Sequence, residues 1–399
     1  MIRKTIPRFL PETRGTDIIR SLLSGIAAKE DSELRLKKQL INLTDTNEAH
    51  LMPSARAGLY WLLRALKPPR LYLPAFLCSS IYECALRAGT PMTYLDCEEG
   101  SFTTCYDGID YEPGSVLLLV HQYGIPSDPN KACQIASQNG LILVEDVAAG
   151  LGGEWKRHPL GSFGDAAIFS FEYSKSISAC KGGALLYNKN ELADKVETCI
   201  RNENSKPTSK SNISWTCDAF KGLLFELALM PLIYGTLTLP LFRLRHGGFV
   251  DRSQTVELDG PYSNAFGAKR ASLTTNILRR LPEIIEGRRK VFSIYRDVLI
   301  DIAEITLPPI PPEADPVCTH FPTLLPNGTR KRIVHGLWAE GIDPGFNFSY
   351  LCGGKTAADS APIALSHTHN VLTLPISSRI QESVAHRIAK TLRALVQKS

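Results

Sequence analysis

The chain has 399 residues, of which 44% are hydrophobic and 21% are charged, the usual balance of a globular protein. The formal net charge of +5 is small, and no basic run with interleaved aromatic residues indicates a nucleic-acid-binding surface, so we expect no nucleic-acid partner. The ten cysteines include no C-x-x-C pair, which argues against a zinc site. Residues 1–10 show no signal-peptide segment, and thiols in a chain without such a segment indicate a cytoplasmic location.

Residues 1–45 are expected to form an N-terminal arm before a large α/β domain at residues 46–247. One face of a helix is predicted from the spacing of Leu59, Leu62, Leu63 and Leu66. Short apolar runs typical of buried strands lie at residues 71–73, 92–95, 116–120, 141–144, 166–171 and 184–187. The alternation of these patterns predicts a three-layer α/β domain with a parallel sheet and right-handed crossovers.

The chain changes character after this domain. The polar residues 203–216 predict a loop, residues 271–300 predict one long helix, and residues 380–397 predict a final helix. Because proline-rich stretches separate short segments between these helices, we expect a smaller α+β domain at residues 248–399.

An uncharged apolar segment lies at residues 227–242 and contains Pro231 and Pro240. It is too short to be assigned as a membrane span, which needs about 20 apolar residues. Two interpretations stay open: a buried or dimer-interface element, or a peripheral contact with a membrane surface. The second is favoured by Arg243 and Arg245, which follow at once.

The first candidate for chemistry is Asp146, at the end of the apolar run 141–144. A carboxylate at the carboxyl end of a parallel strand points into the ligand crevice of an α/β sheet. Its burial is costly unless a cation meets it, and a protonated ring nitrogen of a ligand is such a cation.

The second candidate is Lys175, on the turn after the strand predicted at residues 166–171. A lysine that is partly desolvated there is a usable nucleophile toward an aldehyde. Ser170 is placed to donate a hydrogen bond to a phosphate, and Gly182 with Gly183 allows close backbone approach. Lys181 is the competing lysine, but its position before the two glycines is more typical of a loop.

The third candidate is the segment Ser54-Ala55-Arg56, which opens a predicted helix. Ser54 is a suitable N-cap, and the free N–H groups and positive dipole end of a helix N-terminus favour a phosphate. Arg56 adds positive charge. Taken alone, the segment would be an ordinary capped helix.

Together these segments resemble the DegT/DnrJ/EryC1/StrS family of sugar aminotransferases, which use pyridoxal phosphate (PLP). The resemblance is carried by LPAF at 73–76, VHQYGIP at 120–126, EDVA at 145–148 and the stretch GSFGD to Lys175 at 161–175. It implies the aspartate-aminotransferase fold, a homodimer whose sites are completed by the other chain, an amino-acid donor and a keto-sugar acceptor.

The resemblance also implies roles for individual residues. Lys175 would hold PLP and carry the proton, and Asp146 would face the pyridine nitrogen. Ser170 and the turn from Ser54 to Ala57 would contact the phosphate. His121 and Tyr123 would lie near the substrate.

Several positions depart from the family's pattern. Ala149 replaces a glutamine that would touch the cofactor's phenolic oxygen, and Cys78 stands where an aromatic ring often stacks. Arg56 replaces a threonine, Asn264 only faintly matches a motif that reaches across the dimer, and Lys181 replaces an acidic residue.

Three functional interpretations follow. The leading one is a transaminase that moves an amino group from an amino acid, with L-glutamate the expected donor, to a nucleotide-linked keto sugar in polysaccharide or secondary-metabolite biosynthesis. The second keeps PLP but uses a lipid-linked or membrane-proximal carbonyl substrate. A dehydratase is disfavoured because such relatives replace the lysine with histidine. The third is a non-catalytic regulator with the same fold.

Overall fold

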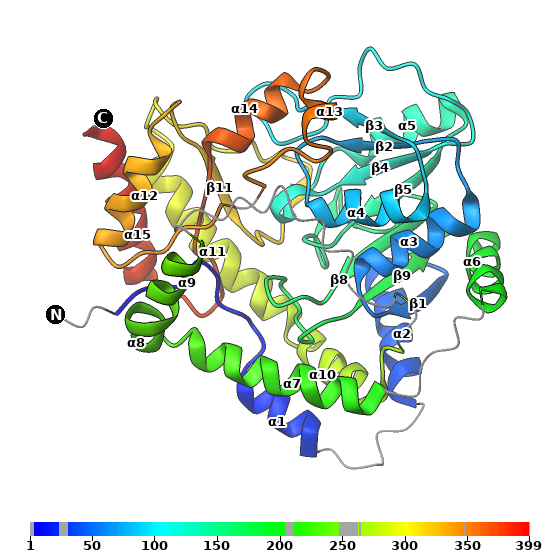
Figure 1. Cartoon of the computed structure of the whole chain (residues 1–399), viewed down its shortest axis with the longest axis horizontal. Coiled ribbons are helices and arrows are strands. Elements are labelled where there is room, and N and C mark those ends of the chain that lie inside the picture. The colour runs from blue at the N-terminus through cyan, green and yellow to red at the C-terminus, as the bar shows by residue number, and fades with distance from the viewer. Residues whose placement is uncertain are drawn as a thin grey trace.

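A computed structural model of the chain describes residues 4–23, 31–203, 211–246, 262, 265–346 and 348–398. Its centre is a seven-stranded sheet (Figure 1). The strands, in spatial order, are β1 (Glu48–Met52), β9 (Gly183–Tyr187), β8 (Ala166–Ser170), β5 (Ile142–Asp146), β4 (Val116–Val120), β2 (Leu71–Pro74) and β3 (Met92–Leu95).

The expected all-parallel sheet is wrong at one edge. Strands β8, β5, β4, β2 and β3 are parallel, but β9 is antiparallel to both β8 and β1. Residues 171–182, which join β8 to β9, contain no helix, and a parallel return needs a crossover of a dozen or more residues, usually helical. The chain therefore turns back beside β8. The strand β1 was not predicted from its sequence.

The three-layer arrangement is confirmed. Residues of one strand alternate between two cores: Val116 and Leu118 of β4 face the core of α3 (Ala55–Leu66) and α4 (Ser79–Ala88), whereas Leu117 and Leu119 face α5 (Pro129–Asn139). This period of two places every β4 side chain in a buried layer. The α3 side also carries α6 (Asn190–Asn202), and the opposite side continues under α2 (Asp31–Thr44).

The predicted helix at residues 271–300 is two helices, α10 (Ala268–Leu278) and α11 (Leu281–Leu299). Pro282 lies in the first turn of α11, where its missing N–H is tolerated, so the chain breaks just before it. Helix α10 packs into the core with α2, whereas α11 continues into the C-terminal core. The boundary predicted at residue 247 stays a prediction.

The C-terminal core is built on a two-stranded antiparallel sheet, β11 (Phe321–Leu324) with β12 (Val371–Leu374). Helices α12 (Arg330–Ala339) and α15 (Glu382–Gln397) cover it together with α11, and α15 agrees with the predicted final helix. The N-terminal arm joins this core, because Ile6 bridges Ile342. Smaller elements are α13 (Lys355–Ala358), α14 (Pro362–Asn370), the 3-10 turn η1 (Gln122–Gly124), and the short strands β6 (Glu154–Trp155), β7 (His158–Pro159) and β10 (Ala314–Asp315).

The apolar segment belongs to a group of helices that runs from the bottom of Figure 1 to its left side. These are α1 (Gly15–Leu23), α7 (Ser211–Ala228), α8 (Pro231–Ile233), the π-helical turn η2 (Tyr234–Thr238) and α9 (Leu239–His246). The loop predicted at residues 203–216 is wrong from residue 211, where α7 begins, and residues 204–210 lie outside the described part. Among the described residues, no one helix has the length and apolarity of a membrane span; only the bent pair Trp215–Ala228 and Pro231–Leu244 reaches them jointly.

Candidate active site

Lys175 lies on the connection between β8 and β9, where its backbone N–H donates to the carbonyl of Glu172 at 3.0 Å. The connection is closed by two more backbone bonds, from Phe171 to Gly182 and from Ala179 to Phe171, each 2.9 Å long. Because β8 and β5 are parallel neighbours with Asp146 opposite Ile168, the carboxyl ends of both strands lie at one edge. The fold thus brings the Lys175 loop to Asp146.

Asp146 is buried, with 7% of its surface exposed, and its Oδ1 accepts a hydrogen bond from the Ala148 N–H at 2.9 Å. Burial raises the pKa of Asp146, while the Ala148 N–H and the charge of Lys175 act in the opposite direction. Within the described part of the chain Asp146 forms no ion pair. Its carboxylate is therefore suited to a cation brought by a ligand.

The phosphate candidates meet at the start of α3. Ser54 is the N-cap of this helix, its Oγ accepting from the Ala57 N–H at 3.2 Å, and its backbone bridges Gly182. Ser170 pairs with Gly183 across β8 and β9, so its hydroxyl lies at the same edge. A Cβ atom on Gly183 would collide with Ala55 N and the Phe169 carbonyl, so only glycine lets these backbones approach so closely.

Charges surround this cradle. The Arg56 Nη1 lies 3.4 Å from Glu83 Oε2. Burial raises the pKa of Glu172, against the opposing charges of Arg56, Lys181 and Lys175. The predicted residues Ser54, Ala55, Arg56 and Ser170 thus share one site with Lys181 and Glu172. Glu172 was not predicted as a site residue. Its position three residues before Lys175, within the FEYSK stretch, could have indicated it.

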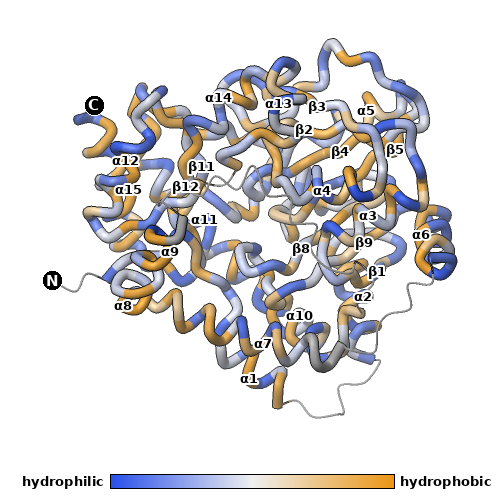
Figure 2. The backbone as a smooth tube through the Cα atoms, viewed as in Figure 1, coloured by the Kyte–Doolittle hydropathy of each residue, from blue (hydrophilic) through white to orange (hydrophobic). Residues whose placement is uncertain are grey.

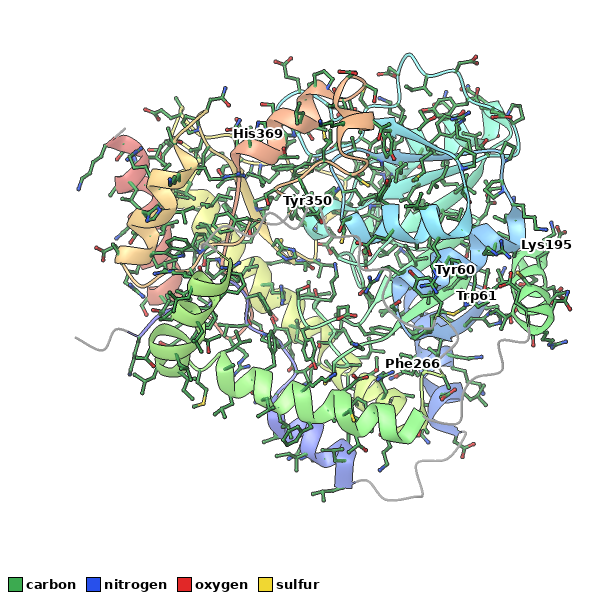
Figure 3. All side chains as sticks on the ribbon, in the orientation of Figure 1. Tyr60, Trp61, Lys195, Phe266, Tyr350 and His369 are labelled. Atoms are coloured by element: carbon green, nitrogen blue, oxygen red, sulfur yellow. The ribbon has the colours of Figure 1, made fainter. Side chains whose placement is uncertain are left out.

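Asn264 lies outside the described residues, but its described neighbours on both sides are held near the cradle. The Trp61 Nε1 donates to the carbonyl of Tyr262 at 3.0 Å, and the Tyr262 ring lies 4.8 Å from that of Tyr60. Phe266 packs against Gly182, leaving no room for a Cβ there. Figure 3 labels Tyr60, Trp61 and Phe266 on these elements.

Cys78 lies at the N-cap of α4, with its Sγ 3.0 Å from the Ser80 hydroxyl. The Tyr350 hydroxyl accepts from the Ser79 N–H at 3.0 Å, so an aromatic side chain from late in the sequence lies near Cys78. Figure 3 labels Tyr350. The contact is fixed by the Cys352 N–H, which donates to the Ala75 carbonyl at 2.7 Å. Tyr350 was not predicted, because only the tertiary fold joins these segments.

Ala149 contributes its backbone. Its carbonyl accepts from the Thr319 hydroxyl at 2.6 Å, and the Ser176 hydroxyl lies 3.0 Å from the same Thr319 oxygen. The Thr319 carbonyl in turn accepts from Arg288 Nη1 at 2.9 Å. This chain of bonds ties the Lys175 loop to α11, and no pattern in the sequence indicates the role of Thr319.

His121 and Tyr123 are both buried, with 1% of their surfaces exposed. The His121 Nδ1 accepts from the Ser127 N–H at 3.2 Å, which leaves Nε2 as the donor to Glu145 Oε2 at 3.2 Å. Glu145 also accepts three backbone N–H bonds of 2.7 to 2.9 Å from residues 161–164. Both ring nitrogens of His121 are engaged by the protein, so we assign it a supporting position. Its predicted substrate contact stays a prediction.

The Tyr123 backbone has φ 59°, and its ring lies 5.1 Å from that of Phe102 and 5.8 Å from that of His320. His320 is an unpredicted member of the site. Burial, the charge of Lys175 and the charge of Arg288 lower its pKa to about 3, so its imidazole is neutral at pH 7. Its Nδ1 has no hydrogen-bond partner among the described residues.

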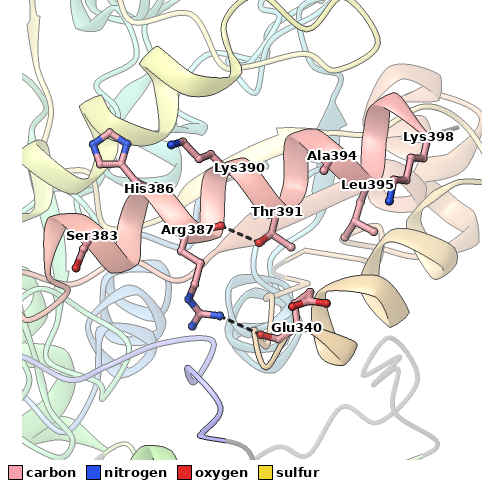
Figure 4. A pocket seen from close by; sticks show the side chains of 9 residues that line it. All are labelled: Glu340, Ser383, His386, Arg387, Lys390, Thr391, Ala394, Leu395 and Lys398. Carbon is pink, nitrogen blue, oxygen red and sulfur yellow. Dashed lines mark hydrogen bonds between the residues drawn. The ribbon is translucent and has the colours of Figure 1, made fainter.

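A separate depression lies along α15, lined by Glu340 and one side of the helix (Figure 4). Arg387 donates to the Glu340 carbonyl at 3.1 Å, and the Thr391 hydroxyl donates to the Arg387 carbonyl at 2.8 Å. These bonds use backbone acceptors, and none of the predicted site residues lines the depression.

The chain is similar to known proteins in sequence and in fold. The sequence pattern of the DegT/DnrJ/EryC1/StrS aminotransferase family matches residues 12–227 and 244–393. The UDP-N-acetyl-3-dehydro-alpha-D-glucosamine 3-aminotransferase of Acidithiobacillus ferrooxidans is 23% identical, over 85% of this chain and 82% of that protein.

Two solved structures share the fold. DesI, solved in the presence of its TDP-sugar product, has a TM-score of 0.75 at 19% identity and is matched over 94% of its length by the whole chain. The putative sugar aminotransferase Spr1654 of Streptococcus pneumoniae, in its PLP form, has a TM-score of 0.74 at 20% identity, with 99% of both chains covered. The expected aminotransferase fold is thus confirmed.

Proposed function

The chain belongs to the DegT/DnrJ/EryC1/StrS aminotransferase family, a family of PLP-dependent enzymes, and from this premise we propose a transaminase that moves an amino group from L-glutamate to a nucleotide-linked keto sugar. The observation that carries the proposal is the position of Lys175 near the buried Asp146 and beside the Ser54–Ser170–Gly183 cradle.

The residues present fit PLP at both ends. The α3 N-terminus offers its first-turn N–H groups, and the cradle is too tight at Gly183 for any side chain, which suits a phosphate. At the other end, Asp146 is a buried carboxylate without an ion-pair partner in the described chain, which suits a protonated pyridine nitrogen. Ser54, Ala55, Arg56 and Ser170 would hold the phosphate.

When bound, PLP supplies an electron sink for a carbanion. Lys175 would hold the cofactor through its Nζ and would remove and return the proton at the reacting carbon. Asp146 would face the ring nitrogen and keep it protonated. His320 stays neutral, so it adds no positive charge beside Lys175.

The acceptor class is supported by relatives. The Acidithiobacillus protein is named for a UDP-linked sugar, and DesI was solved with a TDP-sugar product. The proposal includes a homodimer and the L-glutamate donor expected from the sequence.

The test is a visible absorption spectrum of the purified protein with PLP, before and after L-glutamate. We expect a cofactor band that glutamate bleaches in the wild type, and no such bound band in Lys175→Ala. Borohydride reduction followed by peptide mass mapping should place the cofactor on Lys175 and not Lys181. A cofactor mapped to Lys181 would refute the site, and a band that ignores glutamate would refute the donor.

A further inference from the structure

Large apolar side chains gather on the outer faces of α1, α7, α8 and α9. Of the thirteen exposed large apolar residues in the described chain, ten lie on residues 15–23 or 211–246. On α7 these are Phe220, Leu224 and Leu227, with 61%, 51% and 50% of their surfaces exposed. Their spacing of four and three residues places them on one helix face. Apolar colour follows α7 in Figure 2.

The helical segment after the bend, Pro231–Leu244, shows the same spacing of exposed apolar residues. Leu237, Leu241 and Leu244 have the same spacing and are 56%, 55% and 84% exposed. Met230 and Leu232, both about half exposed, continue the apolar surface across the bend between the two helical segments, where the helices turn by 72°. We call the exposed apolar side chains of residues 220–244 the outer apolar face.

Folding of this segment does not require the outer apolar face. The inner side of the same helices already forms a small core of Leu229, Tyr234 and Leu239 against Phe9 and Trp338. Apolar surface that stays exposed after the core is complete marks an interaction site. The family match also omits residues 228–243, so four of the eight residues of the face, Met230, Leu232, Leu237 and Leu241, lie outside the aminotransferase pattern.

Hydrogen bonding favours lipid over a protein partner. The Thr236 hydroxyl donates to the Leu232 carbonyl at 2.8 Å, and the Thr238 hydroxyl donates to the Ala228 carbonyl at 2.9 Å. A protein interface uses about one hydrogen bond per 100–200 Å², whereas a lipid contact requires polar groups to be satisfied internally. The hydroxyl groups of Thr236 and Thr238 meet the second condition.

The accessible charges around the face are positive, which is the sign that an anionic membrane attracts. The acidic side chains of α1, α7, α8 and α9 all pair with arginines: Asp17 with Arg280, Asp218 with Arg270, and Glu226 with Arg379. Arg20 and Lys221 are exposed beside the apolar residues Ile19 and Phe220. The accessible charge is therefore positive.

We propose that the outer apolar face docks the enzyme on an anionic lipid bilayer, with α7 and α9 lying in the interface. Each of the two helical segments is too short to cross a bilayer, and the bend between them suits a shallow insertion of both. The proposal is independent of the acceptor sugar and of transamination.

The test is flotation of the full-length, PLP-loaded protein with vesicles of phosphatidylcholine containing about 30 mol% phosphatidylglycerol. We expect the protein to float with these vesicles and less with pure phosphatidylcholine. The triple change Leu224→Ser, Leu237→Ser and Leu241→Ser should lower partitioning at least about 30-fold, because each removes a half-exposed leucine from the lipid contact.

The matched control is Leu34→Ser, Leu86→Ser and Ile300→Ser, three leucine-sized residues of similar exposure elsewhere, which should float like the wild type. Arg20→Glu with Lys221→Glu should reduce binding to the anionic vesicles only. The proposal is overturned if the wild type does not float, or if the two triple variants float equally. It is also overturned if the face variant changes only the oligomeric mass in light scattering, because the face would then join two copies of the chain.

Discussion

The buried ion pair of Glu12 with Arg288 joins the N-terminal arm to the candidate site. Glu12 Oε1 accepts from Arg288 Nε at 2.8 Å, and its carboxylate also accepts from the Ser377 hydroxyl, the Ser378 N–H and the Ser378 hydroxyl at 2.6 to 3.0 Å. The side chains of Glu12 and Arg288 are 1% and 3% exposed. Glu12→Ala would leave the Arg288 charge buried and unpaired.

Breaking a buried pair in this way costs about 3–5 kcal/mol, of a total stability of about 5–15 kcal/mol. We expect urea denaturation followed by circular dichroism to show a loss of that size in the free energy of unfolding. Because Arg288 also holds the Thr319 carbonyl, Glu12→Ala should weaken PLP retention on dialysis as well.

The matched comparison is Asp301→Ala, which breaks the exposed pair with Arg393 and should change stability little. Glu12→Gln should lie between the two, because an amide keeps some of the hydrogen bonds without the charge. A Glu12→Ala loss below about 1 kcal/mol, no larger than that of Asp301→Ala, would refute the reasoning.

Three further predictions concern the site. Asp146→Asn keeps an oxygen for the Ala148 N–H but removes the charge, so PLP affinity measured by absorbance titration should fall about tenfold or more, and an unchanged affinity would contradict the assigned role. His320 binds fewer protons folded than unfolded between its folded pKa of about 3 and its ordinary pKa of 6.5, so stability should fall as pH drops through that window. The stability should fall by at most about 1.4 kcal/mol per pH unit. His320→Gln should remove this dependence from urea midpoints measured between about pH 5 and pH 7. Parallel plots of urea midpoint against pH for the wild type and the variant would exclude the buried neutral imidazole. Gly183→Ala should destabilise by about 1–3 kcal/mol, because its Cβ meets Ala55 N; a normal melting temperature would mean that the cradle is looser than described.

The sequence placed Asp146 at a strand end, Lys175 on the turn after a strand and Ser54 at a helix N-cap, and the structure confirms these three positions. A short apolar run bounded by polar or turn residues indicates where a buried strand ends. The N-cap preference of serine similarly fixes where α3 begins. The predicted strands β2, β3, β4, β5, β8 and β9 follow from the same short-range pattern.

The tertiary structure decided what short-range pattern cannot encode. The direction of β9 depends on pairing, because a buried apolar run reads the same in either orientation. Tyr350 reaches Cys78, and His320 reaches Tyr123, across large separations in sequence. Which side of an apolar helix meets the core is equally non-local. The composition of residues 227–242 therefore left two interpretations open, a buried element or a membrane contact. The tertiary structure shows that Tyr234 and Leu239 pack inward, whereas Leu237 and Leu241 are exposed.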